Sequence, residues 1–178
     1  MNILAVYPGT FDPIHYGHID IIQRGAQLFD QLLVAVYDKP LKSLVFSYED
    51  RVALVNQAVQ EMKLTNVQVI GYNGLTVDFC RKVGAKVIVR GLRVFSDFEF
   101  EFRMALANRR LAPEIDIVTL ITHERHTFLS STTVREIASL GGDVSTMVPP
   151  HAEAALQRHF HELGEDGSKV APMTQLRD

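Results

Sequence analysis

The chain has 178 residues, 47% of them hydrophobic and 22% charged, which predicts a single globular domain large enough to bury a core. The formal net charge of −3 argues against a dedicated nucleic-acid-binding protein, because such proteins usually carry a basic excess. The chain has one cysteine, no basic segment followed by an apolar stretch at its N-terminus, and no apolar run near the roughly 20 residues that span a bilayer, so we expect a cytoplasmic protein without a membrane partner.

Short apolar segments and helical patterns alternate along the chain. The segments that we expect to be strands are Ile3–Tyr7, Leu32–Tyr37, Val67–Gly71, Lys86–Val89 and Ile115–Ile121. Helical spacing of apolar residues predicts helices at 19–29, 48–62, 75–83, 97–110, 131–140 and 150–160. This alternation predicts an α/β fold, a Rossmann-like doubly wound parallel sheet of about five strands with helices on both faces. We expect a domain over residues 1–162 and a disordered tail over residues 163–178.

Two serines have the spacing that starts a helix. Ser47 is followed three residues later by Asp50, and Ser96 is followed three residues later by Glu99. In such a capping box the serine side chain accepts a backbone N–H of the first turn. We therefore expect helices to begin directly after Ser47 and Ser96. Gly141-Gly142 should end the helix that precedes them.

The segment between the first predicted strand and the first predicted helix, residues 7–18, reads Tyr-Pro-Gly-Thr-Phe-Asp-Pro-Ile-His-Tyr-Gly-His. In α/β sheets, ligands bind at the carboxyl ends of strands, against helix N-termini whose free N–H groups favour anions. Gly9 and Gly17 let a ligand approach the backbone, and His18 can donate a hydrogen bond to a phosphoryl oxygen. The histidine pair could instead bind zinc or be ordinary, although no Cys or carboxylate set matches it. We therefore interpret this segment as a site for phosphate chemistry.

Other polar motifs follow the remaining predicted strands. Arg90-Gly91-Leu92-Arg93 follows the fourth, and two arginines there can bind phosphates bidentately. Residues 128–135 follow the fifth predicted strand and contain four consecutive hydroxyl side chains. One hydroxyl suffices for a helix cap, so the others can bind a triphosphate. Lys42 follows the second predicted strand. Each motif also has an ordinary interpretation, as a solvated loop, a cap or a surface lysine. Because the carboxyl ends of parallel strands share one edge, we expect these motifs to lie near His18.

Together the motifs resemble one known family. Residues 7–13, His15-x-Gly17-His18, Arg90 to Arg93 and Leu129 to Thr132 occur in the order typical of the bacterial phosphopantetheine adenylyltransferases, and the likeness covers residues 1 to about 160. The His-x-Gly-His element alone would indicate only the wider nucleotidyltransferase superfamily. The resemblance implies transfer of the adenylyl group of ATP to 4′-phosphopantetheine by direct in-line attack, giving dephospho-coenzyme A and pyrophosphate. It also implies Mg²⁺ as cofactor, a homohexamer, and feedback binding of coenzyme A.

The resemblance further implies roles for individual residues. His18 would be catalytic and would stabilise the transition state at the α-phosphate. Thr10, Lys42, Thr76 and Arg90 would bind phosphopantetheine. The residues that would bind ATP are Thr10, Phe11, His18, Gly91, Leu92, Arg93, Glu101, His126, Thr127, Phe128, Leu129, Ser130, Ser131 and Thr132. Mg²⁺ would bridge phosphate oxygens and need few protein ligands, so we expect no metal site made of side chains.

Two alternatives remain open at this point. The chain could be another transferase of the superfamily that acts on a different phosphomonoester or uses CTP. It could also be a non-catalytic nucleotide-binding or regulatory module. The second alternative is disfavoured by the intact set Thr10, His18, Lys42, Arg90 and Arg93, because a degenerate relative would be expected to lose one of them.

Overall fold

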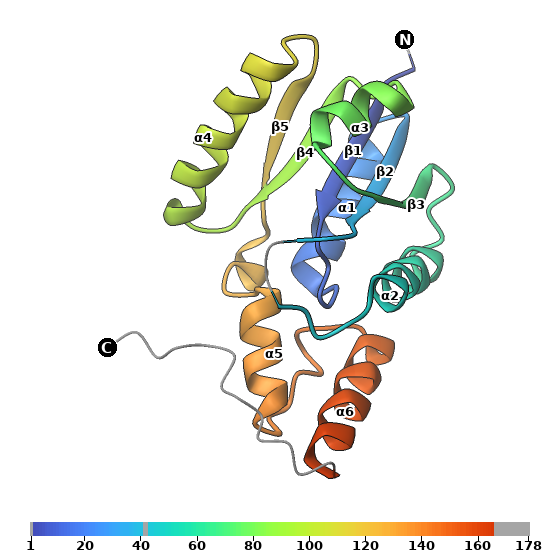
Figure 1. Ribbon diagram of the computed structural model, residues 1–178, viewed down its shortest axis with the longest axis vertical. Helices are drawn as coiled ribbons and strands as arrows, with labels where there is room; N and C mark the ends of the chain where they lie inside the picture. Colours follow the sequence, from blue (N-terminus) through green and yellow to red (C-terminus); the bar gives the residue numbers. More distant parts are fainter. Residues whose placement is uncertain (1, 41–42, 166–178) are drawn as a thin grey trace.

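A computed structural model of the protein describes residues 2–40 and 43–165. Within these ranges five parallel strands form one sheet, in the order β3-β2-β1-β4-β5 (Figure 1). The strands are β1 (Leu4–Gly9), β2 (Gln31–Tyr37), β3 (Val67–Tyr72), β4 (Val87–Leu92) and β5 (Asp116–Ile121). The doubly wound α/β fold that the alternating pattern predicts is therefore confirmed.

Helices connect the strands and continue beyond them. They are α1 (Tyr16–Leu28), α2 (Tyr48–Glu61), α3 (Thr76–Val83), α4 (Phe95–Leu111), α5 (Ser131–Ser139) and α6 (Pro150–Glu165), with a single 3₁₀ turn η1 (Glu124–His126) before α5. Right-handed crossovers place α1 and α2 on one face of the sheet and α3 and α4 on the other. Helices α5 and α6 lie beyond the carboxyl ends of the strands (Figure 1). None of the helices among the described residues is long and apolar enough to cross a membrane.

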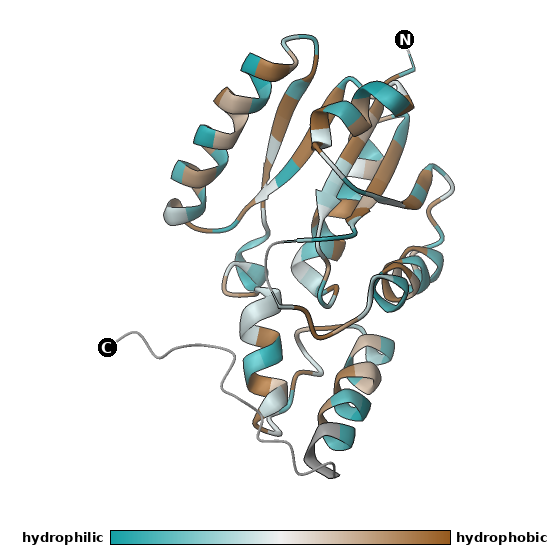
Figure 2. Cartoon of the chain, in the orientation of Figure 1, coloured by the Kyte–Doolittle hydropathy of each residue, from teal (hydrophilic) through white to brown (hydrophobic). Residues whose placement is uncertain are grey.

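The two faces of the sheet bury two separate hydrophobic cores. Alternate residues of β2 point to opposite faces, so Leu32, Val34 and Val36 pack with α1 and α2, whereas Leu33 and Ala35 pack with α3. Because both faces of the central strands are covered, these strands read as continuous apolar runs (Figure 2). This explains why the strands were recognisable in the sequence.

The two predicted helix starts have different outcomes. The Ser47 side chain accepts the N–H of Asp50 at 3.1 Å, so that prediction is confirmed. The prediction for Ser96 is wrong, because α4 has no side-chain cap. The N–H of Asp97 already bonds to the carbonyl of Val94 at 3.0 Å, which places Ser96 inside the first turn rather than before it.

Strand β4 is longer than the sequence predicts, and this changes the setting of one motif. Backbone pairing with β5 continues to Leu92, which lies opposite Ile121. Residues 90–92 therefore belong to the strand and not to the loop after it. The pairing holds the backbone of the motif rigid, whereas Arg93 begins the turn toward α4.

The C-terminal helix also departs from its predicted end. Helix α6 runs to Glu165, beyond Phe160 and beyond the predicted domain boundary at residue 162. Its buried residues Ala152 and Leu156 anchor it against the core, and no proline occurs between Phe160 and Glu165 to stop it. The rest of the predicted tail, residues 166–178, lies outside the described residues.

Candidate functional site

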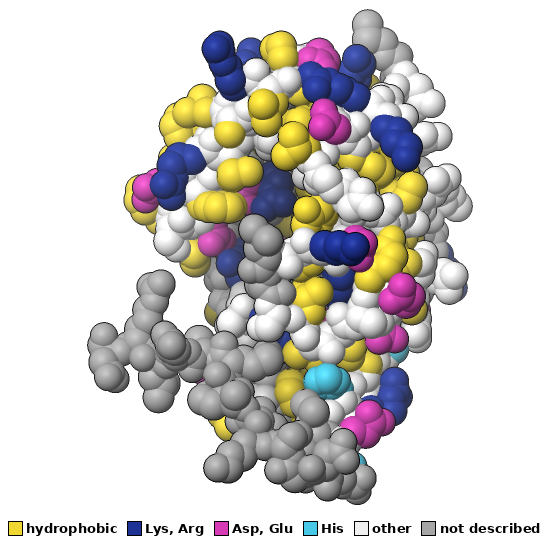
Figure 3. Space-filling model, viewed as in Figure 1, with side chains coloured by type: hydrophobic (Ala, Val, Ile, Leu, Met, Phe, Trp, Pro, Cys, Tyr) yellow, Lys and Arg dark blue, Asp and Glu magenta, His cyan; other side chains and the backbone are white. Residues whose placement is uncertain are grey.

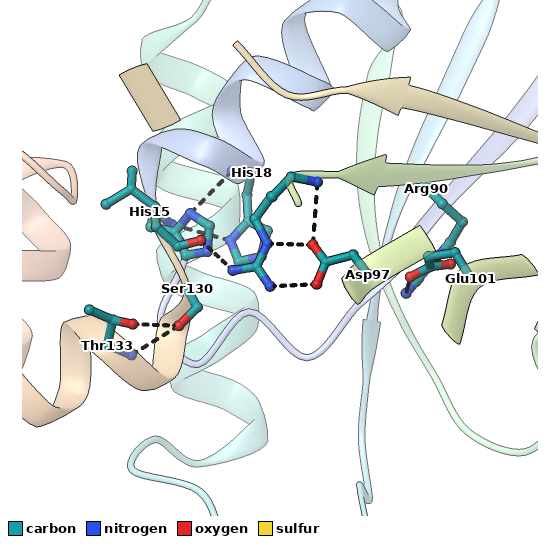
Figure 4. Close-up of polar contacts among 9 residues, drawn as sticks. His15, His18, Arg90, Asp97, Glu101, Ser130 and Thr133 are labelled. Atoms are coloured by element: carbon teal, nitrogen blue, oxygen red, sulfur yellow. Dashed lines mark hydrogen bonds and ion pairs between the residues drawn. The ribbon is translucent and has the colours of Figure 1, made fainter. Parts of the chain in front are cut away.

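The fold itself marks a place for a ligand. Strands β1 and β4 are neighbours, but their following helices lie on opposite faces of the sheet, so a crevice opens beyond their carboxyl ends. Three of the predicted motifs meet there. Arg90 Nη1 donates to the carbonyl of Pro8 at 3.1 Å, and Arg93 Nη1 donates to the carbonyl of Leu129. These bonds link the end of β4 to the end of β1 and to the start of α5. Figure 4 shows side chains of α1, β4, α4 and the start of α5 in this region.

Phe11 shapes the turn after β1. Its φ of +52° lies in the left-handed region, which a non-glycine residue rarely adopts. The buried ring packs edge-on against His18, with ring centroids 4.9 Å apart, and against Tyr7 at 5.6 Å. A Cβ on Gly9 would lie 2.8 Å from the Phe11 ring. The space that Gly9 leaves is thus filled by Phe11, and not by a ligand as the sequence suggested.

His15 and His18 form a reciprocal pair at the N-terminus of α1. His15 Nδ1 accepts the backbone N–H of His18, and His18 Nδ1 accepts the backbone N–H of His15, both at 3.3 Å. The rings stack with centroids 3.6 Å apart (Figure 4). Burial, together with the positive charges of Arg93 and His126, lowers the pKa of His15 to about 3. The His15 ring is therefore neutral at physiological pH and supports the ring of His18.

The two arginines of the β4 motif are oriented by carboxylates of α4. Arg90 donates two hydrogen bonds to Glu101, at 2.8 and 2.7 Å, in a bidentate pair. Arg93 pairs with Asp97, with Nε at 3.0 Å from the carboxylate. The bidentate geometry fixes the plane of the guanidinium group. Glu101 therefore lies beside Arg90 at the end of β4, whereas its predicted contact with ATP stays a prediction.

The hydroxyl side chains at the start of α5 all have partners within the protein. Ser130 is the N-cap and accepts the N–H of Thr133 at 3.0 Å. Ser131 donates to the carbonyl of Pro13 at 2.9 Å, which ties α5 to the turn after β1. The hydroxyl of Thr132 accepts a hydrogen bond from the guanidinium of Arg135, one turn further along α5, at 3.4 Å. Contacts of these hydroxyls with a triphosphate stay a prediction.

The segment before α5 lies against α1. His126 is in η1, where its Nε2 accepts the Arg125 Nε–H at 3.2 Å and its ring lies 6.2 Å from the ring of Tyr16. Partial burial, with the nearby charge of Arg125, lowers the pKa of His126. Thr127 donates to a carbonyl of η1, and Phe128 is largely exposed. This segment forms one wall of the crevice with little core packing of its own.

Thr76 is a predicted substrate ligand that comes from a different strand end. It begins α3, after β3. Its hydroxyl lies 2.9 Å from the hydroxyl of Tyr72. Tyr72 in turn lies near enough to Arg90 for the two groups to interact electrostatically. Lys42 lies outside the described residues. Contact of Thr76 and Lys42 with a substrate stays a prediction.

Sequence reasoning missed a buried ion pair beneath the site. Asp12 is 1% exposed, and its carboxylate accepts the backbone N–H groups of Val45 and Phe46 at 3.1 and 2.9 Å. The same carboxylate lies 3.3 Å from Nη1 of Arg135. Asp12 therefore holds together the turn after β1, helix α5 and the segment that follows Lys42.

Arg51 is a second buried charge that the sequence did not reveal. Its guanidinium donates to the carbonyls of Thr10, Tyr37 and Asp38, at 2.8, 2.7 and 3.0 Å. These carbonyls end β1 and β2, so Arg51 links the two strand ends that flank the predicted substrate path. It positions the backbone of Thr10, a predicted ligand of both substrates.

One signal in the sequence could have identified Arg51. It stands three, four and seven residues before Leu54, Val55 and Ala58, which form the apolar face of α2. A charged residue on such a face must be buried and paired. Nothing comparable marks Asp12, because its partners come from distant segments of the chain.

Within the part of the chain that the structure describes, no group of three or more His, Cys, Asp or Glu side chains could hold a metal ion. The carboxylates at the crevice, Asp97 and Glu101, are paired with arginines. The crevice therefore offers positively charged groups, N–H donors and a helix N-terminus, which together suit a ligand that carries several phosphates.

Comparison with known proteins agrees with this geometry. The sequence matches the cytidylyltransferase-like family over residues 6–137. It is 52% identical over 164 residues to a phosphopantetheine adenylyltransferase from Methylococcus capsulatus, covering 92% of this chain and 100% of that protein. It is 53% identical over 157 residues to a phosphopantetheine adenylyltransferase from Roseiflexus sp., covering 88% of this chain and 97% of that protein.

A solved structure of a candidate nicotinate-nucleotide adenylyltransferase from Vibrio parahaemolyticus superposes with a TM-score of 0.67 at 23% identity, covering 88% of this chain and 99% of that one. At that identity the superposition supports the fold alone. The identity to the sequence relatives is far higher and extends over 92% and 88% of this chain. The protein is therefore a cytidylyltransferase-like protein that belongs to the phosphopantetheine adenylyltransferase family.

Proposed function

We propose that the protein transfers the adenylyl group of ATP to 4′-phosphopantetheine, forming dephospho-coenzyme A and releasing pyrophosphate. The observation that carries this proposal is the position of His18, at the N-terminus of α1 in the crevice between β1 and β4. The charge of Arg93 acts on the adjacent His15, and Arg90 is bonded to the end of β1. Membership of the family supports the identity of the two substrates. No feature of the crevice favours a different acceptor or a purely regulatory role.

The reaction needs positioning and charge stabilisation rather than a covalent intermediate. An oxygen of the acceptor phosphate attacks the α-phosphorus of ATP as the bond to pyrophosphate breaks. Negative charge develops on the oxygens of the transferring phosphoryl group. The ring of His18 and the free N–H groups at the start of α1 would donate hydrogen bonds to that charge. Holding both substrates in line supplies much of the remaining rate enhancement.

The site residues divide between the two substrates. Arg90 would bind the phosphate of phosphopantetheine, with Lys42 and Thr76 further along its path. Arg93 would bind ATP phosphates, and the wall formed by residues 126–132 would contact the nucleotide. Glu101 and Asp97 would hold the two arginines in place for these roles.

Three further properties form part of the proposal. Mg²⁺ would be carried by the triphosphate oxygens, where it would neutralise charge, in keeping with a crevice whose carboxylates are paired with arginines. Coenzyme A would bind in the same crevice, because it contains both the adenosine and the pantetheine parts of the product. A cytoplasmic location is in keeping with a single cysteine, Cys80, that is buried and free.

We also propose that the chain assembles into a homohexamer, with α4 in an interface between copies. Helix α4 has no buried residue, although it is rich in phenylalanine. Its exposed apolar surface is visible at the upper left of Figure 3, beside a hollow in which Lys and Arg side chains lie. The exposed apolar residues of this helix are Phe95, Phe98, Phe100, Phe102, Met104, Leu106 and Leu111. A patch of this kind is typical of a surface that another protein covers.

The oligomeric state can be tested by light scattering during size-exclusion chromatography. The unmodified protein is expected to have six times the chain mass of 20.0 kDa. Phe98→Glu is expected to give smaller species, because it places a charge in the apolar surface of α4. Ala53→Glu adds the same charge at an exposed position of α2 and should leave the hexamer intact. If the unmodified protein has the mass of a single chain, the proposal is contradicted. If the Phe98→Glu variant is still a hexamer, α4 is not in the interface.

The activity can be tested by pyrophosphate release from ATP and Mg²⁺. Separate reactions receive 4′-phosphopantetheine, nicotinamide mononucleotide or glycerol 3-phosphate. We expect release with phosphopantetheine alone and dephospho-coenzyme A as the product. Release with another acceptor would overturn the substrate but keep the reaction type. ATP binding without release in any reaction would favour a regulatory module.

A further inference from the structure

We propose that His15 is a positioning residue that fixes the tautomer of His18, so that His18 acts as a neutral imidazole with its proton on Nε2. The Nε2–H would donate a hydrogen bond to the transferring phosphoryl group, and this part of the proposal rests on the proposed function. The tautomer itself does not, because it follows from contacts within the protein. It can therefore be tested without any substrate.

The main chain of His15 determines which nitrogen of His18 carries the proton. A neutral imidazole has one N–H donor and one acceptor nitrogen. The backbone N–H of His15 donates to Nδ1 of His18 at 3.3 Å, so Nδ1 must hold the lone pair. The proton of the neutral ring is then on Nε2. The same reasoning applies to His15, whose Nδ1 accepts the backbone N–H of His18.

The same contact disfavours a charged His18. A second proton would have to bind at Nδ1, where it would face the N–H of His15 and break the capping bond. The positive end of the α1 dipole lies at the same place. Phe11 contacts the His18 ring edge-on, and the positive charges of Arg93 and His126 act on His15 beside it. A second proton on Nδ1 of His18 is therefore incompatible with the capping bond that this nitrogen accepts.

The side chain of His15 holds this arrangement in place. Its ring lies against one face of His18 with centroids 3.6 Å apart, while Phe11 contacts the His18 ring edge-on. Gly17 leaves the room that the His15 ring needs, because a Cβ there would lie 3.0 Å from two of its atoms. His15 is 4% exposed and thus has little surface for contact with a substrate. Its role is to orient the residue beside it.

A neutral donor suits the proposed reaction. The acceptor phosphate is already an anion, and the new P–O bond forms as the bond to pyrophosphate breaks, so the enzyme need not give or take a proton. His18 Nε2–H can donate a hydrogen bond to the developing charge and keep its proton throughout. A preorganised donor of this kind stabilises the transition state without reorganising during the reaction.

The tautomer can be measured by NMR on the full-length protein labelled with ¹⁵N-histidine, with a His18→Gln variant to assign the His18 signals. We expect the Nδ1 signal of His18 to have the chemical shift of an unprotonated nitrogen and the Nε2 signal that of a protonated one. A proton on Nδ1, or a fully charged ring at pH 7, would overturn the proposal. Failure of the adenylyl transfer assay would leave this result unaffected.

The role of His15 requires a variant and two readouts. His15→Ala removes both the ring stack and the cap, and we expect kcat to fall roughly 10- to 100-fold while KM changes much less. The His18 signals should then show a mixture of tautomers. His161→Ala, at an exposed position of α6, is the control and should match the unmodified enzyme. Unchanged His18 signals in His15→Ala, with or without a loss of kcat, would reject the positioning role. If His15→Ala does not fold, His15→Asn, which retains an N-cap acceptor, replaces it with the same criteria.

Discussion

Replacing His18 with alanine is expected to lower kcat by about 10²- to 10³-fold, with a much smaller change in the KM for ATP. The ring of His18 is stacked on His15 and contacted by Phe11, so its donor is held at the N-terminus of α1 before any substrate binds. Such a donor contributes mainly where charge develops, in the transition state, and less to binding of the ground state. Steady-state kinetics of pyrophosphate release, with each substrate varied in turn, gives kcat and KM separately.

His18→Gln is the matched variant for this measurement. Its side-chain amide keeps an uncharged N–H donor on a chain of similar length, so it should retain more activity than His18→Ala. Thermal unfolding of both variants must first show that the fold is intact, since His18 also takes part in the capping box of α1. A kcat for His18→Ala within a few-fold of the unmodified enzyme would show that the ring does not act on the transition state.

Replacing Asp12 with alanine is expected to reduce the free energy of unfolding by about 3–5 kcal/mol, the usual effect of breaking a buried ion pair. The side chain of Arg135 is only 7% exposed and would keep its charge without the carboxylate. The N–H groups of Val45 and Phe46 would also lose their acceptor. Urea unfolding followed by far-UV circular dichroism measures the change. Tryptophan fluorescence cannot be used, because the chain has no tryptophan.

Asp116→Ala is the control for this variant. Asp116 pairs with Arg109 at 3.8 Å on the surface, where both side chains are more than two-thirds exposed, so its loss should change the free energy of unfolding by at most about 1 kcal/mol. Both variants are compared at one chain concentration, because assembly contributes to the apparent stability. Equal urea midpoints for Asp12→Ala and Asp116→Ala would mean that the buried pair has no special role.

Local sequence patterns are enough to predict the fold class and the edge of the sheet at which the candidate site lies. Both follow from local patterns: continuous apolar runs for strands that are buried on two faces, and helical spacing between them. The order of strand and helix then predicted a parallel sheet, whose strand ends all face one crevice. His18 could be placed there because it begins the helix that follows the first strand, and Arg93 because its motif follows the fourth.

The groups that hold these residues in place become visible only in the folded chain. Arg51 reaches carbonyls 13 to 41 positions away, and Asp12 pairs with Arg135, 123 positions along the chain. Such partners are set by strand order and helix packing, which no local spacing encodes. The same holds for Gly9, whose missing side chain makes room for Phe11, and for Arg90, which pairing with β5 keeps within a strand. The type and spacing of residues predict a helix or a strand, whereas contacts between distant segments determine the role of each side chain within it.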